Sequence, residues 1–182
     1  RILDALDKNQ LADDTLVVLL SDHGEAFGVH RVAGQQMFFH GQTLYDELTR
    51  VPLLVHVPGS PPVRADDTAM LIDVAPTIVV AMGLEIPPSF VGRSLLAAIE
   101  GRPLPPRPAY AELLKAPSWQ HSAKMIVSAD GRYKLLYRIS EPGFELYDLR
   151  TDPTERTNLL AKEPERAEKM KGDLSRWMEV DL

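Results

Sequence analysis

The sequence predicts an α/β fold in its first hundred residues, followed by a small antiparallel sheet packed on a C-terminal helix. Two apolar runs of strand length, at 15–20 and 51–57, are continuous rather than alternating. Such runs are typical of strands covered on both faces of a parallel sheet. From residue 109 the pattern changes to short strand-like runs separated by turns, and one amphipathic segment closes the chain.

In the first part, hydrophobic spacing and turn residues give the following order. We expect a helix over 1–9, a strand over 15–20, a loop over 26–41, a short helix over 42–50 and a strand over 51–57. An apolar segment at 70–82 is expected to be helical, with Pro76 near its start and Gly83 at its end. A further short helix is expected over 92–100.

Four prolines within 101–108 mark the best candidate for a domain boundary. We therefore predict one domain over 1–104 and a second over 105–182. In the second domain, four strands are expected over 109–113, 123–128, 133–138 and 144–149. The last helix, over 163–180, has an apolar face made of Ala167, Met170, Leu174, Trp177 and Met178.

Two strands of the buried type cannot form a stable parallel sheet without neighbours. The first hundred residues are therefore expected to be half of a sheet. The chain also begins at Arg1 rather than Met, inside a predicted helix. Both observations favour a piece of a longer protein.

Composition narrows the function. The 182 residues are 45% hydrophobic and 25% charged, which indicates an ordinary globular protein. A net charge of −6 argues against a nucleic-acid-binding surface, so no nucleic-acid partner is expected. The absence of cysteine excludes a disulfide, a thiolate zinc site and a cysteine nucleophile within the chain.

The sharpest chemical signal is Asp22-His23, directly after the first apolar run. The carboxyl end of a buried parallel strand is where α/β folds place ligands. A carboxylate and a neutral imidazole can both bind one divalent cation. The structural alternative is that Asp22 caps a turn and His23 is an ordinary loop histidine.

His40 is the second candidate, in a segment that could fold back over Asp22-His23. A histidine there could bind an anionic group, donate a proton to a leaving oxygen, or bind a metal. Packing is the structural alternative.

Other polar residues are expected to have structural roles. Asp46 and Glu47 are expected on a helix surface with a salt bridge to Arg50, and Asp73 as a helix N-cap. Local backbone bonds are expected for Asp148, Asp152 and Glu155, and solvated side chains for Lys124 and Lys134.

The order of four blocks resembles the sulfatases of the alkaline phosphatase superfamily. The run LADDTLVVLLSDHGE at 11–25 is similar to their second metal-ligand strand, and 40–55 to the block after it. Residues 71–77 with 92–95 are similar to a third block. The run ELYDLRTDPTERTNL at 145–159 is similar to their C-terminal signature. The blocks cover nearly the whole chain.

This resemblance implies the C-terminal part of an alkaline-phosphatase-like mixed sheet with flanking helices, then the small antiparallel domain. It also implies hydrolysis of a sulfate monoester on a small molecule or glycan. The implied cofactors are one divalent cation, calcium before manganese or magnesium, and a formylglycine made from Cys or Ser in a Cys/Ser-x-Pro-x-Arg motif. A periplasmic, extracellular or membrane-tethered parent is implied as well.

Carried over by residue, Asp22 and His23 match the family's C-terminal metal ligands. His40 falls where the family has a Lys or His that contacts the sulfate or leaving group. His30 falls near a Gly-Glu-His-Gly position of the family. The sequence here is Gly28-Val-His-Arg31, so no role is expected for His30.

The Cys/Ser-x-Pro-x-Arg motif and the N-terminal acidic ligands do not occur in the chain. It therefore has half a metal site and no nucleophile, and we expect it to be inert in isolation. Two alternatives stay open. One is a phosphoryl-type enzyme of the same superfamily, such as a phosphonate monoester hydrolase or a phosphoglycerol transferase. The other is a non-catalytic domain that has kept only the fold.

Overall fold

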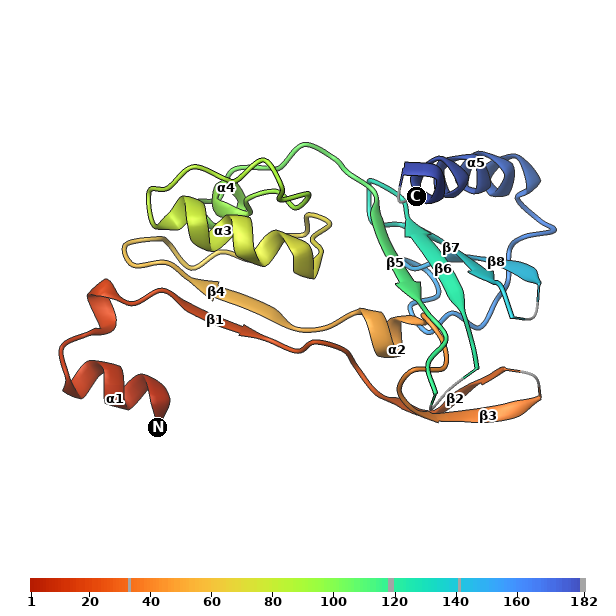
Figure 1. Cartoon of the computed structure of the whole chain (residues 1–182), viewed down its shortest axis with the longest axis horizontal. Coiled ribbons are helices and arrows are strands. Elements are labelled where there is room, and N and C mark those ends of the chain that lie inside the picture. Colours follow the sequence, from red (N-terminus) through yellow and green to blue (C-terminus); the bar gives the residue numbers. More distant parts are fainter. Residues whose placement is uncertain (33, 118–119, 141, 181–182) are drawn as a thin grey trace. The chain divides into compact units, whose positions relative to one another are not determined.

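A computed structural model describes residues 1–32, 34–117, 120–140 and 142–180 of the chain (Figure 1). The chain forms two compact units, the first made of 1–22 and 52–105 and the second of 23–51 and 106–182. The domain boundary after residue 104 stays a prediction. Within the described ranges, none of the helices has the length and apolar character needed to cross a bilayer.

The first unit is built around a pair of strands with helices before and after it. Its elements are α1 (Ile2–Lys8), η1 (Ala12–Asp14), β1 (Val17–Leu20), β4 (Leu53–His56), η2 (Leu71–Asp73), α3 (Val74–Ala81) and α4 (Leu96–Ile99). The helices and strands expected here from hydrophobic spacing are therefore present.

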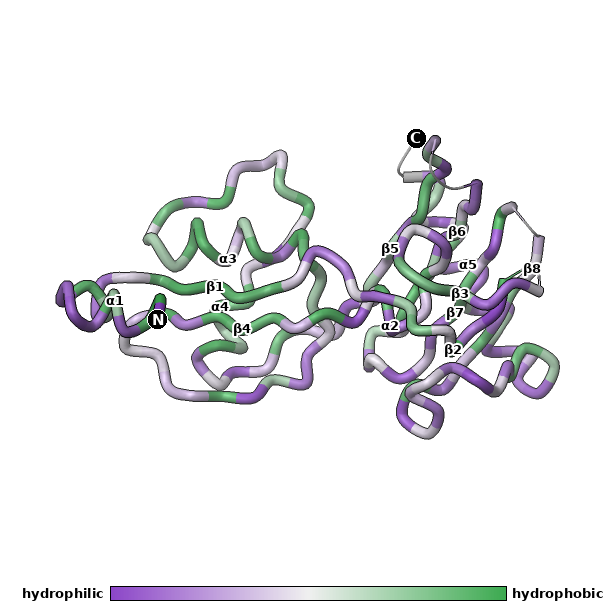
Figure 2. Tube along the Cα trace, turned by 90° about the horizontal axis from the view of Figure 1, so that it is seen from below, coloured by the Kyte–Doolittle hydropathy of each residue, from purple (hydrophilic) through white to green (hydrophobic). Residues whose placement is uncertain are grey.

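β1 and β4 pair antiparallel, with Leu20 opposite Leu53. Both runs were expected in a sheet of the parallel type; the two strands instead pair antiparallel with each other, which the expected mixed sheet allows. β1 is apolar along its length, and β4 is apolar up to its last residue, His56 (Figure 2). Leu19 and Leu54 lie opposite each other and are 56% and 60% exposed. The described strands are thus not covered on both faces.

Asp73 is fully buried at the start of α3. Its carboxylate accepts hydrogen bonds from the backbone N–H groups of Met70 and Arg93. Asp73 therefore stands at the N-cap position, as predicted, but the hydrogen bonds of its carboxylate join the turn before α3 to the segment before α4.

The second unit contains a hairpin, a short helix, a four-stranded sheet and the C-terminal helix. Its elements are β2 (Ala26–Val32), β3 (Gln35–Phe39), α2 (Asp46–Thr49), β5 (Ala109–Leu113), β6 (Ala123–Val127), β7 (Tyr133–Arg138), β8 (Gly143–Asp148) and α5 (Pro164–Val180). The sheet order β5-β6-β7-β8 is the antiparallel meander that the turn spacing predicted.

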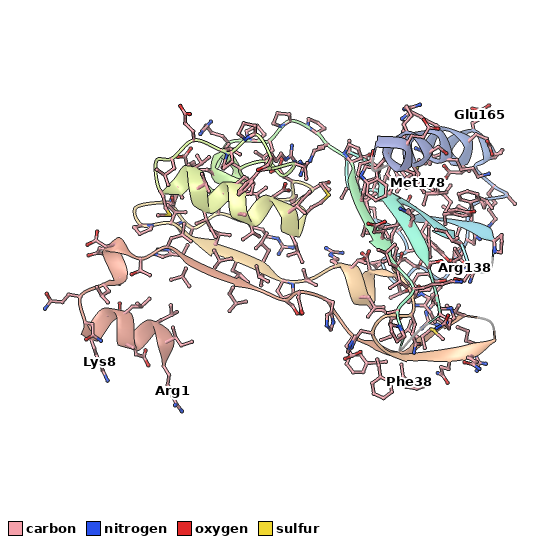
Figure 3. The ribbon with its side chains drawn as sticks, viewed as in Figure 1. Arg1, Lys8, Phe38, Arg138, Glu165 and Met178 are labelled. Atoms are coloured by element: carbon pink, nitrogen blue, oxygen red, sulfur yellow. The ribbon has the colours of Figure 1, made fainter. Side chains whose placement is uncertain are left out.

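The β2–β3 hairpin replaces the loop predicted over 26–41. Ala26 and Val32 of β2 pack with Met37 of β3 in a small buried cluster, while Phe27 and Phe38, paired across the strands, are exposed. Phe38 lies on the hairpin in Figure 3. Because apolar residues stand on both faces, the polar–apolar alternation that indicates a half-buried strand is missing from the sequence.

The four-stranded sheet is covered on both faces. On one face, Leu135 and Leu146 are fully buried against Ala167, Met170 and Leu174 of α5, as the apolar face of that helix predicted. Met178 also packs on this cluster (Figure 3).

On the other face, Leu136 of β7 is fully buried against Leu44 and Tyr45, which directly precede α2. The sheet therefore supports the segment that carries α2.

Candidate active site

His23 is held in one tautomer by the backbone beside it. Its Nδ1 lies 2.7 Å from the carbonyl oxygen of Gly24. Because a carbonyl oxygen only accepts, Nδ1 carries the proton in this contact, and Nε2 is the ring nitrogen on the other side. Histidines that bind metal ions commonly donate their other ring N–H to a backbone carbonyl. His23 makes a contact of this kind with Gly24, and Asp22 precedes it in the chain.

Gly24 fits against the end of α2 with no room for a side chain. Its N–H donates to the carbonyl oxygen of Leu48 over 2.8 Å. A Cβ at this position would lie 2.1 Å from the carbonyl oxygen of Glu47. The backbone of α2 therefore fixes where His23 stands.

We expect Gly24→Ala to destabilise the protein by about 3 kcal/mol, because backbone atoms must move to admit the methyl group. The matched control is Gly172→Ala in α5, where the nearest atom is Arg176 Nη1 at 3.8 Å. It should stabilise by about 0.5–1 kcal/mol through helix propensity. Thermal unfolding of both variants checks this, and an unchanged melting temperature for Gly24→Ala would contradict the close contact.

His40 lies against His23, as the sequence predicted for the two segments. The ring centroids are 4.4 Å apart and the planes are inclined by 31°. His40 follows β3 at a sharp turn, where Phe39 has a φ of 67° and Gly41 a φ of 80°. A bulky residue at positive φ is uncommon, and such strain is concentrated at functional sites.

Glu25 is a further candidate site residue, which the sequence motifs did not indicate. Its Oε2 lies 3.5 Å from Nδ1 of His40. Its Oε1 is buried and accepts no hydrogen bond within the described part of the chain. Glu25 stands two residues after His23 in the same polar run, which is the only signal that could have indicated it.

Comparison with known proteins decides the family. The model of a family described as N-sulphoglucosamine sulphohydrolase, C-terminal, matches residues 34–179. The chain belongs to this sulfatase family. The matched range includes His40 and begins after Asp22 and His23.

Individual sulfatases agree. The chain is 32% identical over 173 residues to the Delta 4,5-hexuronate-2-O-sulfatase of Bacteroides thetaiotaomicron. This alignment covers 90% of the chain and 34% of that relative. A solved 2-O GAG sulfatase superposes with a TM-score of 0.82 at 25% identity, covering 98% of this chain and 39% of the other. The chain thus spans about a third of the length of the curated relatives it matches.

A second activity is found among the structural neighbours. The phosphonate monoester hydrolase of Silicibacter pomeroyi superposes with a TM-score of 0.73 at 26% identity, covering 100% of this chain and 37% of the other. The fold predicted from the sulfatase resemblance, the C-terminal part of an α/β sheet followed by the small antiparallel domain, is confirmed.

In this sulfatase chain, His30 has a structural role, because its ring contacts neighbouring segments. Nδ1 lies 3.0 Å from Oε1 of Glu47, and Nε2 lies 3.0 Å from the carbonyl oxygen of Thr154. The ring stacks on Tyr45 at 3.7 Å between centroids. His30 therefore joins the segment before α2 to the loop after β8. It is not part of the His23–His40 pair.

The acids of α2 do not pair as predicted. Glu47 contacts His30, and Asp46 pairs with Lys134 at 2.9 Å, in place of the expected salt bridge to Arg50. Lys134 is fully buried rather than solvated. Both expectations failed because α2 packs against other elements: Asp46 meets Lys134 of β7, and Glu47 meets His30 of β2.

Asp148 has the structural role that was expected. Its carboxylate accepts two hydrogen bonds from the guanidinium of Arg132, at 3.0 and 2.7 Å, and one from the backbone N–H of Arg150. The Arg132 guanidinium holds the pKa of Asp148 below its usual range.

Proposed function

We propose that this chain is the C-terminal part of a metal-dependent sulfatase that hydrolyses sulfate monoesters of a small molecule or glycan in the complete protein. Membership of the sulfatase family and the contact between His23 and His40 support the proposal. In it, Asp22 and His23 bind a divalent cation and His40 acts on the leaving oxygen. The nucleophile, a formylglycine, comes from outside this chain.

The donor set suits a hard or borderline divalent cation, with calcium proposed first and magnesium or manganese as alternatives. His23 presents Nε2, and the buried Oε1 of Glu25 is an acceptor that a donor or a cation would satisfy. The described residues contain no group of three or more His, Cys, Asp or Glu able to hold a metal, so further ligands must come from elsewhere. A cation bound there would stabilise the negative charge on the sulfate oxygens.

His40 suits proton donation to the departing alcohol. With Nδ1 toward Glu25, the opposite nitrogen, Nε2, is the donor to the substrate. When the bond between sulfur and the bridging oxygen breaks, that oxygen takes the proton from His40 and leaves as the neutral alcohol. The sulfur bonds to an oxygen of the nucleophile as the bridging bond breaks, and that bond to the protein is broken again when sulfate is released. Over the whole cycle one water molecule is consumed, which accounts for the oxygen and hydrogen gained by the sulfate and for the proton gained by the alcohol. His40 then recovers its proton from solvent.

The proposal is tested by removing and restoring the cation in the complete gene product. Dialysis against a chelator should abolish release of inorganic sulfate from a sulfated sugar, and calcium, magnesium or manganese should restore it. The isolated 182-residue chain, assayed in parallel, should release none. Full activity after chelation would contradict the metal role. A complete protein with no turnover and no metal-dependent shift in melting temperature would favour the non-catalytic alternative.

The phosphonate monoester hydrolase neighbour favours a second candidate function. The same residues would then act on a phosphonate or phosphate ester, since cation, proton donor and leaving oxygen have the same roles in that reaction. The relative rates for the two ester classes separate the candidates.

A further inference from the structure

The second unit contains a buried charge cluster that the proposed chemistry does not use. Lys134 of β7 has a fully buried side chain, and its Nζ lies 2.9 Å from Oδ1 of Asp46 and 2.9 Å from Oε1 of Glu155. The side chain of Glu155 is 1% exposed and that of Asp46 14% exposed. We call Lys134, Asp46 and Glu155 the buried triad. Breaking such a pair leaves an uncompensated buried charge.

The triad anchors α2 through Asp46, by its side chain and by its backbone N–H. Lys134 binds the side chain of Asp46, and the carboxylate of Glu155 accepts a hydrogen bond from the backbone N–H of the same Asp46. Lys134 Nζ also lies 3.4 Å from Oγ1 of Thr49, at the other end of this short helix. The helix is therefore fixed at both ends to groups of the C-terminal sheet and the loop after it.

The loop that presents Glu155 is under backbone strain. Glu155 has a φ of 52°, a conformation that residues other than glycine rarely adopt. The carboxylate of Asp152 holds the loop by accepting the N–H groups of Arg156 and Thr157 at 2.8 and 2.7 Å. Burial also raises the pKa of Glu155, an effect that Lys134 opposes. This strained, desolvated carboxylate contacts both Lys134 and the backbone N–H of Asp46 at the start of α2.

The position of α2 affects the candidate site, because the backbone of Gly24 is in direct contact with this helix. The N–H of Gly24 donates to Leu48 in α2, and Gly24 lies so close to Glu47 that no side chain fits between them. Gly24 also supplies the carbonyl oxygen that fixes the tautomer of His23. A shift of α2 therefore moves His23 relative to His40.

We propose that the buried triad is a set of positioning residues that sets the geometry of His23 against His40. This inference rests on the proposed function for its effect on catalysis, but its structural part does not. The C-terminal sheet then supports the candidate site indirectly, since its Lys134 fixes the helix that Gly24 contacts.

The test compares two Lys→Met variants of the complete gene product. Lys134→Met leaves the carboxylates of Asp46 and Glu155 without their shared cation. Lys124→Met is the control, because Lys124 stands on the neighbouring strand and pairs with Glu112 at 2.7 Å, away from α2. Circular dichroism establishes that each variant is folded.

The structural readout is NMR of the imidazole rings with labelled histidine, assigned by single His→Gln variants. At 4.4 Å between centroids, each ring shifts the resonances of the other. Lys134→Met should move the His23 and His40 signals and leave that of His56, in the first unit, unchanged. Its kcat/KM for sulfate ester hydrolysis should fall by about tenfold to 100-fold, because small misplacements of catalytic groups are costly. Lys124→Met should change neither.

A double variant distinguishes a positioning role of the triad from general destabilisation of the protein. Adding Glu155→Gln to Lys134→Met removes one of the two repelling carboxylates and should return part of the NMR shifts and of kcat/KM. If Lys134→Met does not fold, Glu155→Gln alone replaces it, with a smaller displacement expected.

A folded variant with wild-type His23 and His40 signals overturns the proposal, as do displaced signals with wild-type kcat/KM. A wild-type protein that releases no sulfate overturns the proposed function instead, and the NMR comparison still decides whether the triad positions the two rings.

Discussion

Asp22→Ala in the complete protein is expected to lower kcat/KM for a sulfate monoester by about 1000-fold. A cation on the sulfate oxygens contributes several kcal/mol in the transition state, and each 1.4 kcal/mol is a factor of ten. The carboxylate of Asp22 supplies charge that the neutral imidazole of His23 cannot replace. Metal content per protein, measured by mass spectrometry of the elements, should fall together with the rate.

The matched control is Asp66→Ala. The Asp66 side chain is 95% exposed and only 4.0 Å from Arg64 at its nearest, so its loss should leave kcat/KM within about twofold. His23→Ala should behave like Asp22→Ala. Full metal content and wild-type turnover in either site variant would remove both residues from the metal site.

His40→Asn is expected to lower kcat by about 100-fold to 10000-fold for a sulfated sugar, the range for loss of a general acid. The contact with Glu25 and the ring contact with His23 place the imidazole at the site, while asparagine has no proton to give at neutral pH. His121→Asn, in the same unit, is the control and should have wild-type kinetics.

The leaving group separates the roles that the sequence left open for His40. A proton donor matters little when the leaving oxygen belongs to an acidic phenol, so His40→Asn should be far less impaired with 4-nitrophenyl sulfate than with a sulfated sugar. An equal loss for both substrates would show that His40 binds the sulfate instead. A parallel loss of bound metal would show that it is a ligand.

Local patterns predicted most of the secondary structure, and each failure has a physical cause. The meander was predictable because turns separate its short strand-like runs, and the helix because the apolar face of α5 is regular in sequence. The β2–β3 hairpin was not, since exposed Phe27 and Phe38 remove the alternation. The antiparallel pairing of β1 with β4 depends on the path of the intervening chain, which neither run encodes.

For the candidate site, the sequence indicated that the segment of His40 could fold back over Asp22-His23, and the rings of His23 and His40 are in contact. Lys134 was expected to be solvated because nothing in its strand indicates a partner. Asp46 is 88 residues away, and the loop of Glu155 folds onto the same point from beyond β8. Contacts of that kind come from tertiary structure alone.

The most direct test of the account is the specificity of the complete, metal-loaded protein. Its kcat/KM should be measured for a sulfate monoester and for a phosphonate monoester that share one leaving group. The account predicts release of inorganic sulfate and a higher kcat/KM for the sulfate ester. A preference for the phosphonate, or no sulfate release at all, would contradict assignment of these residues to a sulfatase site.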